Sequence, residues 1–145
     1  MKTKKSLLTS VAIIMFLLIT GLSCEKETLT SDVNHTWKFD GFVNLSNSSF
    51  EKADPSDCED CYVLTFLKSG KLTGRTTTNT ISGEFQIDGH DIEITNLIKT
   101  EIIELGSGEK YTEAISLTNK YEIMNNTLKL YYNQNQNYLQ FKLSK

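Results

Sequence analysis

The sequence predicts a single all-β domain with one short helix, in which about eight antiparallel strands form a barrel-like or sandwich sheet. Aromatic, β-branched and turn-forming residues are plentiful while alanine is sparse, which favours strands over helices. Apolar residues also alternate with polar residues along much of the chain after residue 35, as in a half-buried strand. A sheet of this size protects its edges by curling or by folding upon itself.

The first predicted strand begins near His35, and Gly41 within it predicts a bulge or a close approach of another chain segment. Its alternating apolar residues are Trp37, Phe39 and Val43. Residues 44–57 are polar and contain the single proline of the chain. They predict a long loop with one helical turn at residues 50–53.

Three further strands are predicted in the middle of the chain, over residues 62–68, over residues 71–78 and around Phe85 and Ile87. The dipeptide Asp88-Gly89 then predicts a hairpin with a type I′ turn. Beyond this turn the alternating residues Ile92 and Ile94 predict the returning strand.

One short amphipathic helix is predicted after the flexible break at residues 106–108. Its apolar positions recur at helical spacing, at Tyr111, Ala114, Ile115 and Thr118. Period-2 alternation then returns, with a turn at Asn125-Asn126. Three strands are therefore expected after the helix and complete the domain.

The N-terminus resembles the signal peptide and lipobox of a bacterial lipoprotein. Three lysines precede an apolar stretch at residues 11–19, which is too short to span a bilayer as a permanent helix. Small residues then lead to Cys24. The resemblance implies that residues 1–23 are removed and that Cys24 becomes the lipidated N-terminus.

This N-terminus sets the expected domain organisation and location. Residues 24–34 are polar and predict a flexible tether, with the β-domain at residues 35–145. The lipid on Cys24 would attach the protein to the outer membrane, facing either the periplasm or the cell surface. We expect a monomer whose membrane partner is contacted through this lipid.

The charge of the chain argues against nucleic-acid binding. The full chain has 15 basic and 18 acidic side chains, a formal charge of −3, and loss of residues 1–23 removes three lysines and no acid. Nucleic-acid binding depends on clustered basic residues, which neutralise phosphates. The acidic mature chain lacks that pattern.

The stretch from Gly74 to Gly89 resembles the signature of the META domain of HslJ-like bacterial envelope proteins. The matching residues are Gly74, Asn79, Ser82, Gly83, Phe85, Asp88 and Gly89. Thr78 stands where that family has a cysteine, so its redox or covalent chemistry is not expected here. We interpret the motif as structural: the glycines allow unusual backbone geometry, and Asn79 can bond to its own backbone in a turn.

The pair Cys58 and Cys61 is predicted to form a structural disulfide. An exported protein folds in an oxidising compartment, and the acidic neighbours of the pair work against a lowered thiol pKa. A redox pair and half of a zinc site remain the alternatives. Zinc would need two more ligands, and only His35 and His90 are available, without paired spacing.

No catalytic residue, cofactor or metal site is expected. The four acids between Asp54 and Asp60 could bind calcium, but EF-hand spacing is lacking and a solvated acidic loop explains them. Neither histidine has a nucleophile at a spacing that a catalytic motif requires.

The sequence thus predicts a lipid-anchored envelope protein that acts as a non-enzymatic binding or structural module. Its partner would be an envelope protein or a small apolar ligand, and the META resemblance implies a role in envelope stress tolerance. The alternative function is a lipocalin-like carrier, which would need an apolar interior large enough for a ligand.

Overall fold

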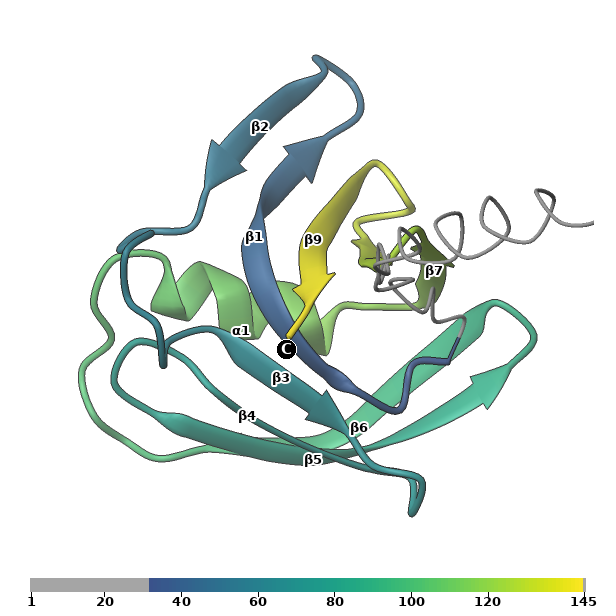
Figure 1. The fold of residues 1–145 in the computed structure, drawn as a ribbon, viewed down its shortest axis with the longest axis horizontal. Helices are drawn as coiled ribbons and strands as arrows, with labels where there is room; N and C mark the ends of the chain where they lie inside the picture. The colour runs from purple at the N-terminus through teal and green to yellow at the C-terminus, as the bar shows by residue number, and fades with distance from the viewer. Residues whose placement is uncertain (1–31, 145) are drawn as a thin grey trace, which may run out of the picture.

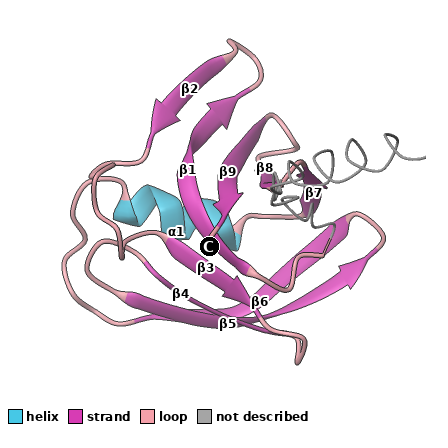
Figure 2. Ribbon diagram, in the orientation of Figure 1, coloured by secondary structure: helices cyan, strands magenta, loops and turns pink. Residues whose placement is uncertain are grey.

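The computed structural model describes residues 32–144, which form a single antiparallel sheet of nine strands with one helix. The sheet curls into a ring (Figures 1 and 2). The elements are β1 (Thr36–Asn44), β2 (Ser49–Lys52), β3 (Val63–Phe66), β4 (Lys71–Arg75), β5 (Thr80–Asp88), β6 (Asp91–Lys99), α1 (Gly108–Ser116), β7 (Lys120–Met124), β8 (Thr127–Tyr132) and β9 (Asn137–Leu143). The predicted fold class, mostly β with one short helix, is confirmed.

Strand β1 closes the ring because it pairs on both of its edges. One edge pairs with β3 over its first half and with β2 over its second half, and the other edge pairs with β9 from Trp37 to Asn44. The register of the β1–β9 pair shifts between Phe39 and Gly41, which confirms the predicted bulge. A side chain at Gly41 would lie 2.7 Å from the ring of Phe50, so glycine also permits the predicted close approach.

The prediction of a long loop over residues 44–57 was wrong, because this segment contains β2. The side-chain oxygen of Asn44 accepts the N–H of Ser46 at 2.9 Å and closes a tight turn, so the chain reverses at once and pairs with β1. All four residues of β2 are exposed. Since neither face of β2 is buried, the sequence carries no alternating pattern from which this strand could be predicted.

The hairpin between β5 and β6 forms where it was predicted, but its turn differs from the prediction. Asp88 and Asp91 are the last paired residues, so the central residues are Gly89 and His90. Gly89 has a φ of 60°, and His90 is not among the residues with positive φ. One positive φ at the first central position fits a type II′ turn, not the predicted type I′ turn. The type I′ pattern occurs instead at Asn125 and Asn126, with φ of 52° and 59°.

Helix α1 forms as predicted, and its residues Tyr111, Ala114 and Ile115 are buried. It packs against β6, β8 and β9, and three strands follow it. The ring is weakest beside this helix, because β6 and β7 pair only at Asp91 and Lys120.

Side chains fill the interior of the ring. An aromatic cluster at its centre joins three strands or loops to the helix, with ring centroids 4.9 Å apart for Phe39 and Tyr111 and 5.2 Å apart for Tyr62 and Tyr111. Phe141 of β9 stacks against Phe39 at 5.3 Å. Among the described residues, the interior of the ring is thus occupied by the side chains of the protein's own core.

The hydroxyl of Tyr111 is buried without a hydrogen-bond partner among the described residues. Burial raises the pKa of this phenol far above its ordinary value. The neighbouring hydroxyl of Tyr62, in contrast, donates to the carbonyl of Asp54. The two tyrosines therefore differ in what their hydroxyls contribute to the stability of the fold: the Tyr62 hydroxyl forms a hydrogen bond and the Tyr111 hydroxyl does not.

We expect Tyr111→Phe to raise the free energy of unfolding by about 1 kcal/mol, since it removes an unpaired buried hydroxyl. Tyr62→Phe is the matched control and should lower the free energy of unfolding by about 1 kcal/mol, because it removes one of the two hydrogen bonds that the Asp54 carbonyl accepts, the other coming from the N–H of Ser107. Urea denaturation of both variants measures the two values. A loss of stability in Tyr111→Phe as large as that in Tyr62→Phe would contradict the prediction.

Candidate functional site

Cys24, the predicted lipidation site, lies outside the described residues. Cys58 and Cys61 are joined by a disulfide. The ammonium of Lys38, on β1, donates to the carbonyls of Cys58 at 2.7 Å and Glu59 at 2.9 Å, and also to that of Cys61. These carbonyls are therefore occupied by an amino group of the chain itself. Burial lowers the pKa of Lys38, although Asp60 and Glu59 partly oppose this effect.

Within residues 32–144, no three His, Cys, Asp or Glu side chains are grouped so that they could hold a metal ion. The two histidines lie against different aromatic rings. His35 contacts Trp37 edge-on at 6.3 Å between ring centroids, and His90 lies 6.4 Å from Tyr121. The described part of the chain also contains no helix with the length and hydrophobicity needed to cross a bilayer.

Several residues of the Gly74–Gly89 motif occupy structural positions in the sheet. Gly74 lies where a side chain would press against Ile81 and Leu64, and Gly83 lies opposite the bulge in β6. Ser82 pairs with Ile98, and Phe85 is buried against Phe66 at 5.0 Å. Asp88 and Gly89 belong to the hairpin turn already described.

Asn79 differs from its prediction, because its side chain does not serve its own turn. The turn is closed instead by Thr76, whose hydroxyl accepts the N–H of Asn79 at 2.9 Å. The Asn79 amide reaches across to the segment after β6. Its oxygen accepts the N–H of Ile102 at 2.8 Å and the hydroxyl of Thr100 at 2.7 Å, and its nitrogen donates to the carbonyl of Ile102 at 2.7 Å.

Glu104 completes this network and was not identified from the sequence. Its carboxylate accepts hydrogen bonds from four consecutive side chains, at 2.8 Å from Thr76, 2.9 Å from Thr77, 3.2 Å from Thr78 and 2.7 Å from Asn79. Burial by itself would raise the pKa of Glu104, but the four hydrogen bonds outweigh it and hold the pKa below its ordinary value. We call Thr76–Asn79 with Glu104 the carboxylate clasp.

The clasp is a structural device, not a ligand site. All four of its donors are engaged by a carboxylate of the same chain, and Thr76 and Asn79 are buried. Its effect is to fix the 100–107 loop, between β6 and α1, against the turn between β4 and β5.

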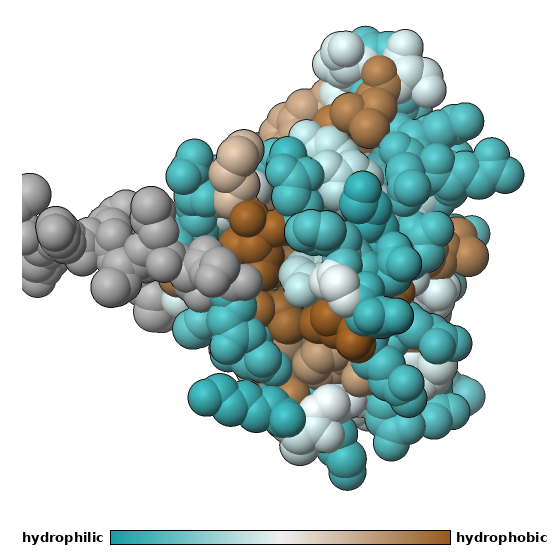
Figure 3. Space-filling model, turned by 90° about the vertical axis from the view of Figure 1, so that its right-hand side faces the viewer, coloured by the Kyte–Doolittle hydropathy of each residue, from teal (hydrophilic) through white to brown (hydrophobic). Residues whose placement is uncertain are grey.

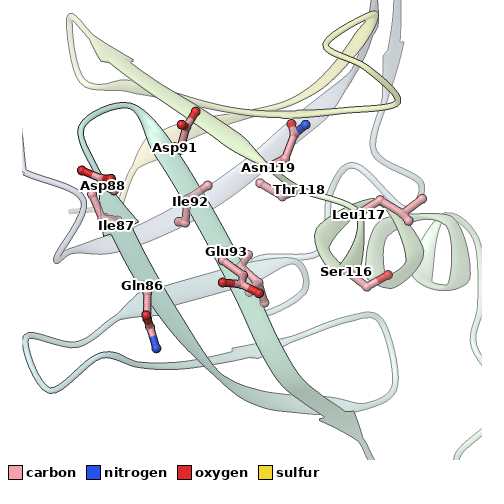
Figure 4. Close-up of a pocket in the computed structure, with 11 residues that line it drawn as sticks. Gln86, Ile87, Asp88, Asp91, Ile92, Glu93, Ser116, Leu117, Thr118 and Asn119 are labelled. Carbon is pink, nitrogen blue, oxygen red and sulfur yellow. The ribbon is translucent and has the colours of Figure 1, made fainter.

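An open groove lies where β6 and β7 diverge, between the β5–β6 hairpin and the C-terminal end of α1 (Figure 4). It has a volume of about 600 Å³. Its apolar lining comes from Ile87, Ile92 and Ile94 on the hairpin and from Leu117 after the helix. Leu117, which follows the last residue of α1, is 55% exposed and so presents apolar surface to the groove. Figure 3 looks onto the side of Figure 1 that carries the hairpin and β7, and apolar surface gathers in its middle.

The groove is acidic. Asp88, Asp91 and Glu93 line it, and none of them forms an ion pair or side-chain hydrogen bond with a described residue. No lysine, arginine or histidine is among its lining residues. The C-terminal end of α1 adds a partial negative charge, and the last turn of the helix holds no basic residue to offset it.

A second groove, of about 470 Å³, lies on the other side of the same helix end. It shares Leu117 and Asn119 with the first groove and is otherwise lined by Ala114, Tyr132 and polar residues. Its charges are mixed, since both Lys110 and Glu113 line it. The first groove therefore has the more distinctive chemistry, because its lining combines apolar side chains with charges of one sign only.

Comparison with known proteins identifies relatives by sequence family and by fold. The model of the family described as "Domain of unknown function (DUF4847)" matches residues 18–143. The crystal structure of a DUF4847 family protein from Bacteroides vulgatus ATCC 8482 has a TM-score of 0.58 and 21% identity, covering 78% of this chain and 94% of that one. An NMR structure of a protein from Burkholderia xenovorans has a TM-score of 0.63 and 15% identity, covering 77% and 83%. No curated protein matches the chain.

The expected membership of the META domain family was wrong, because the family model that matches is a different one. The resemblance arose because the residues that match the META signature have roles common to many β-sheets. A hairpin glycine, a glycine opposite a bulge and an aromatic core residue are needed by many antiparallel sheets, and Gly89, Gly83 and Phe85 fill these positions here. Asn79, the most specific residue of the motif, holds a loop through Glu104, which the resemblance did not include.

Glu104 should make the stability of the protein depend on acid pH. Because the pKa of its carboxyl is held below the ordinary value of 4.5, the charged form stabilises the fold above pH 4.5. This contribution is lost as the pH falls below 4.5 and through the lower pKa of the folded state. We expect Glu104→Gln to lower the free energy of unfolding by about 1 kcal/mol at pH 7 and by less at pH 3.

Urea denaturation at both pH values measures this difference. Glu101→Gln changes an exposed neighbour on the same loop and should have no such effect at either pH. An equal loss in Glu104→Gln at pH 7 and pH 3 would show that the charge of Glu104 contributes nothing.

Proposed function

The chain belongs to the DUF4847 family, a family of unknown function, and from this premise we propose that it is a lipid-anchored envelope protein acting as a non-enzymatic binding module. Its ligand would carry a positive charge and an apolar body and would bind in the groove between the β5–β6 hairpin and the end of α1. The role in stress tolerance came from the META resemblance alone and is not proposed again.

One observation carries the binding proposal: three carboxylates and the apolar side chains of Ile87 and Leu117 line one groove, with no cation among the lining residues. Like charges on one surface repel one another, and a bound cation relieves that repulsion. The exposed apolar side chains add affinity for a hydrocarbon portion in proportion to the area that it covers. An amine or quaternary ammonium group on an alkyl chain has both properties.

The filled interior of the ring weighs against a lipocalin-like carrier. The largest side chains of the core, including Trp37, Tyr62 and Phe66, are fully buried there. A ligand in that position would have to displace them, whereas a ligand in the surface groove displaces only water.

The anchor proposal rests on the N-terminal sequence. The family match begins at residue 18 and so includes the small residues 21–23 and Cys24. A lipid on Cys24 would place the protein at the outer membrane, on its periplasmic face or at the cell surface.

Hexyltrimethylammonium should bind the groove, whereas hexanesulfonate, with the same alkyl length and the opposite charge, should not. Binding is expected to shift the NMR methyl signals of Ile92, Ile94 and Leu117 in the labelled chain. The triple variant Asp88→Asn, Asp91→Asn, Glu93→Gln should weaken binding about tenfold, because three attractive charges are lost. Glu101→Gln, remote from the groove, is the control. Equal shifts with both probes would contradict the proposal.

Cys24→Ser should release the protein from the membrane fraction of the cells that express it. The wild-type chain should carry a diacylglycerol and an acyl group on residue 24, which mass spectrometry of the N-terminal peptide detects. Cys58→Ser with Cys61→Ser removes the other two cysteines and should leave the protein in the membrane fraction. A wild-type N-terminal peptide without lipid would contradict the anchor.

A further inference from the structure

The second groove contains an amide that the protein leaves unpaired. Asn137 lines this groove, and its side-chain oxygen is buried without a hydrogen-bond partner among the described residues. Its amide nitrogen likewise donates to no described residue. Buried polar atoms in proteins are nearly always paired, because an unpaired one costs stability. Since the amide of Asn137 has no hydrogen bond to give up, it can turn toward a ligand without losing one.

The position of Asn137 follows from the alternation along the last two strands. Leu130 of β8 and Leu139 of β9 are completely buried in the ring. Side chains two positions apart on a strand face the same side, so Tyr132 and Asn137 face the interior as well. These two residues also form the last pair of the β8–β9 ladder, before the loop that joins the strands. They therefore lie at the rim of the ring, and ligand pockets often occupy the mouth of a closed sheet.

Three more amide side chains line the same groove, those of Asn119, Asn133 and Gln134. None of them forms a side-chain hydrogen bond with a described residue. Each amide offers N–H donors on its nitrogen and an acceptor on its oxygen. A ligand that pairs with several amides must therefore both donate and accept, and a hydroxyl group does both.

The loop between β8 and β9 holds two of these amides in an unusual backbone conformation. Asn133, Gln134 and Asn135 have φ of 52°, 55° and 62°, in the left-handed region that few residues other than glycine adopt. The N–H of Gln136 donates to the carbonyl of Asn133 at 3.0 Å, and the carbonyl of Gln136 accepts the N–H of Leu45 at 2.9 Å. Backbone of this kind is concentrated at binding sites, where it positions side chains before the ligand arrives.

The charges of the groove favour a neutral ligand. Lys110 and Glu113, one turn apart on α1, are its charged lining residues and have opposite signs. The ammonium of Lys110 already pairs with the carboxylate of Glu51 at 2.6 Å. Burial and the carboxylates of Glu51 and Glu113 raise the pKa of Tyr132, so its hydroxyl keeps its proton and can donate. An anion would meet the carboxylates and a cation would meet the ammonium.

We infer that the second groove binds a neutral saccharide. A sugar ring carries hydroxyls around its edge and C–H groups on its faces, which matches amides beside the side chains of Tyr132 and Leu117. The volume of about 470 Å³ lies within the range of small-ligand pockets, about 300–1,000 Å³. This ligand differs from the cationic one proposed for the first groove, and the inference does not depend on that proposal.

NMR titration of the isotope-labelled full chain tests the inference. The neutral probes are glucose, galactose, mannose and N-acetylglucosamine, and the charged counterparts are glucosamine and glucuronate. At least one neutral sugar should shift the side-chain amide signals of Asn133, Gln134 and Asn137. The charged sugars should bind about fivefold more weakly than that sugar. No shift with any neutral sugar, or a charged sugar that binds as tightly, overturns the inference.

Asn137→Leu separates a binding role from a structural one. Leucine has nearly the shape of asparagine and removes the unpaired oxygen, so the midpoint of urea denaturation should not fall. Saccharide binding should nevertheless weaken about tenfold, because the polar contact is lost. Tyr111→Phe is the matched control: it removes the other unpaired buried oxygen of the described residues, away from the groove, and should bind as the wild type does. Wild-type affinity in Asn137→Leu overturns the inference.

Gln134→Gly is a second variant that does not disturb the core. Gln134 is exposed and glycine accepts its positive φ, so the fold should be retained while saccharide binding weakens about threefold. Unchanged affinity in this variant contradicts the role of the amides.

Hexyltrimethylammonium keeps the two grooves apart in the same experiment. Asn137 lines only the second groove, so Asn137→Leu should bind this probe as the wild type does. A chain that binds a neutral sugar but not hexyltrimethylammonium contradicts the proposal for the first groove alone. The reverse result contradicts the saccharide inference and leaves the first groove intact.

Discussion

The pairing of β1 with β9 is the constraint on which the rest of the molecule depends. It joins Trp37–Asn44 to Asn137–Leu143, the first and last strands of the described chain, and so turns a meander of neighbouring hairpins into a ring. The ring encloses the cluster of Phe39, Tyr62, Tyr111 and Phe141, to which both of these strands contribute. Without this pair, the aromatic side chains of β1 and β9 would face water, and α1 would have no core to pack on.

The ring is nevertheless incomplete, and the incomplete place is where the functional proposal lies. Between β6 and β7 the ladder is reduced to Asp91 and Lys120, and the helix packs beside the gap. A strand edge next to a helix end leaves polar and apolar groups side by side, which a continuous sheet would not. The groove and its carboxylates follow from that geometry, just as the exposed 100–107 loop follows from the connection that must lead from β6 into α1.

Much of this fold could be predicted because the core residues repeat with a regular period. Tyr111, Ala114 and Ile115 share one face of α1, and the alternation along β1 and β9 reflects burial on one side of the sheet. Strand β2 could not be found in this way, because all of its residues are exposed and its pairing depends on a turn made by Asn44.

The candidate sites were harder to predict, because they depend on contacts between distant segments. Glu104 meets Thr76 across 28 positions, and a run of threonines followed much later by a glutamate has no recognisable spacing. The groove likewise combines the hairpin with residues that follow α1. The only hint in the sequence was the number of acids near Asp88, which by itself fits an ordinary hairpin. The META resemblance failed for the same reason: it compared local turn chemistry, while family membership reflects the whole chain.

The position of β9 also determines when the protein can fold. The strand that closes the ring is the last strand of the described residues, so a growing chain that has not yet reached Leu143 lacks all or part of it. Contacts that link the two ends of a chain form late and slowly, because the intervening segment must first be brought together. The ring would therefore stay open, and its aromatic cluster incomplete, until β9 has been synthesised. A fold that is completed by its last described strand thus gains its stability only at the end of the synthesis of this domain.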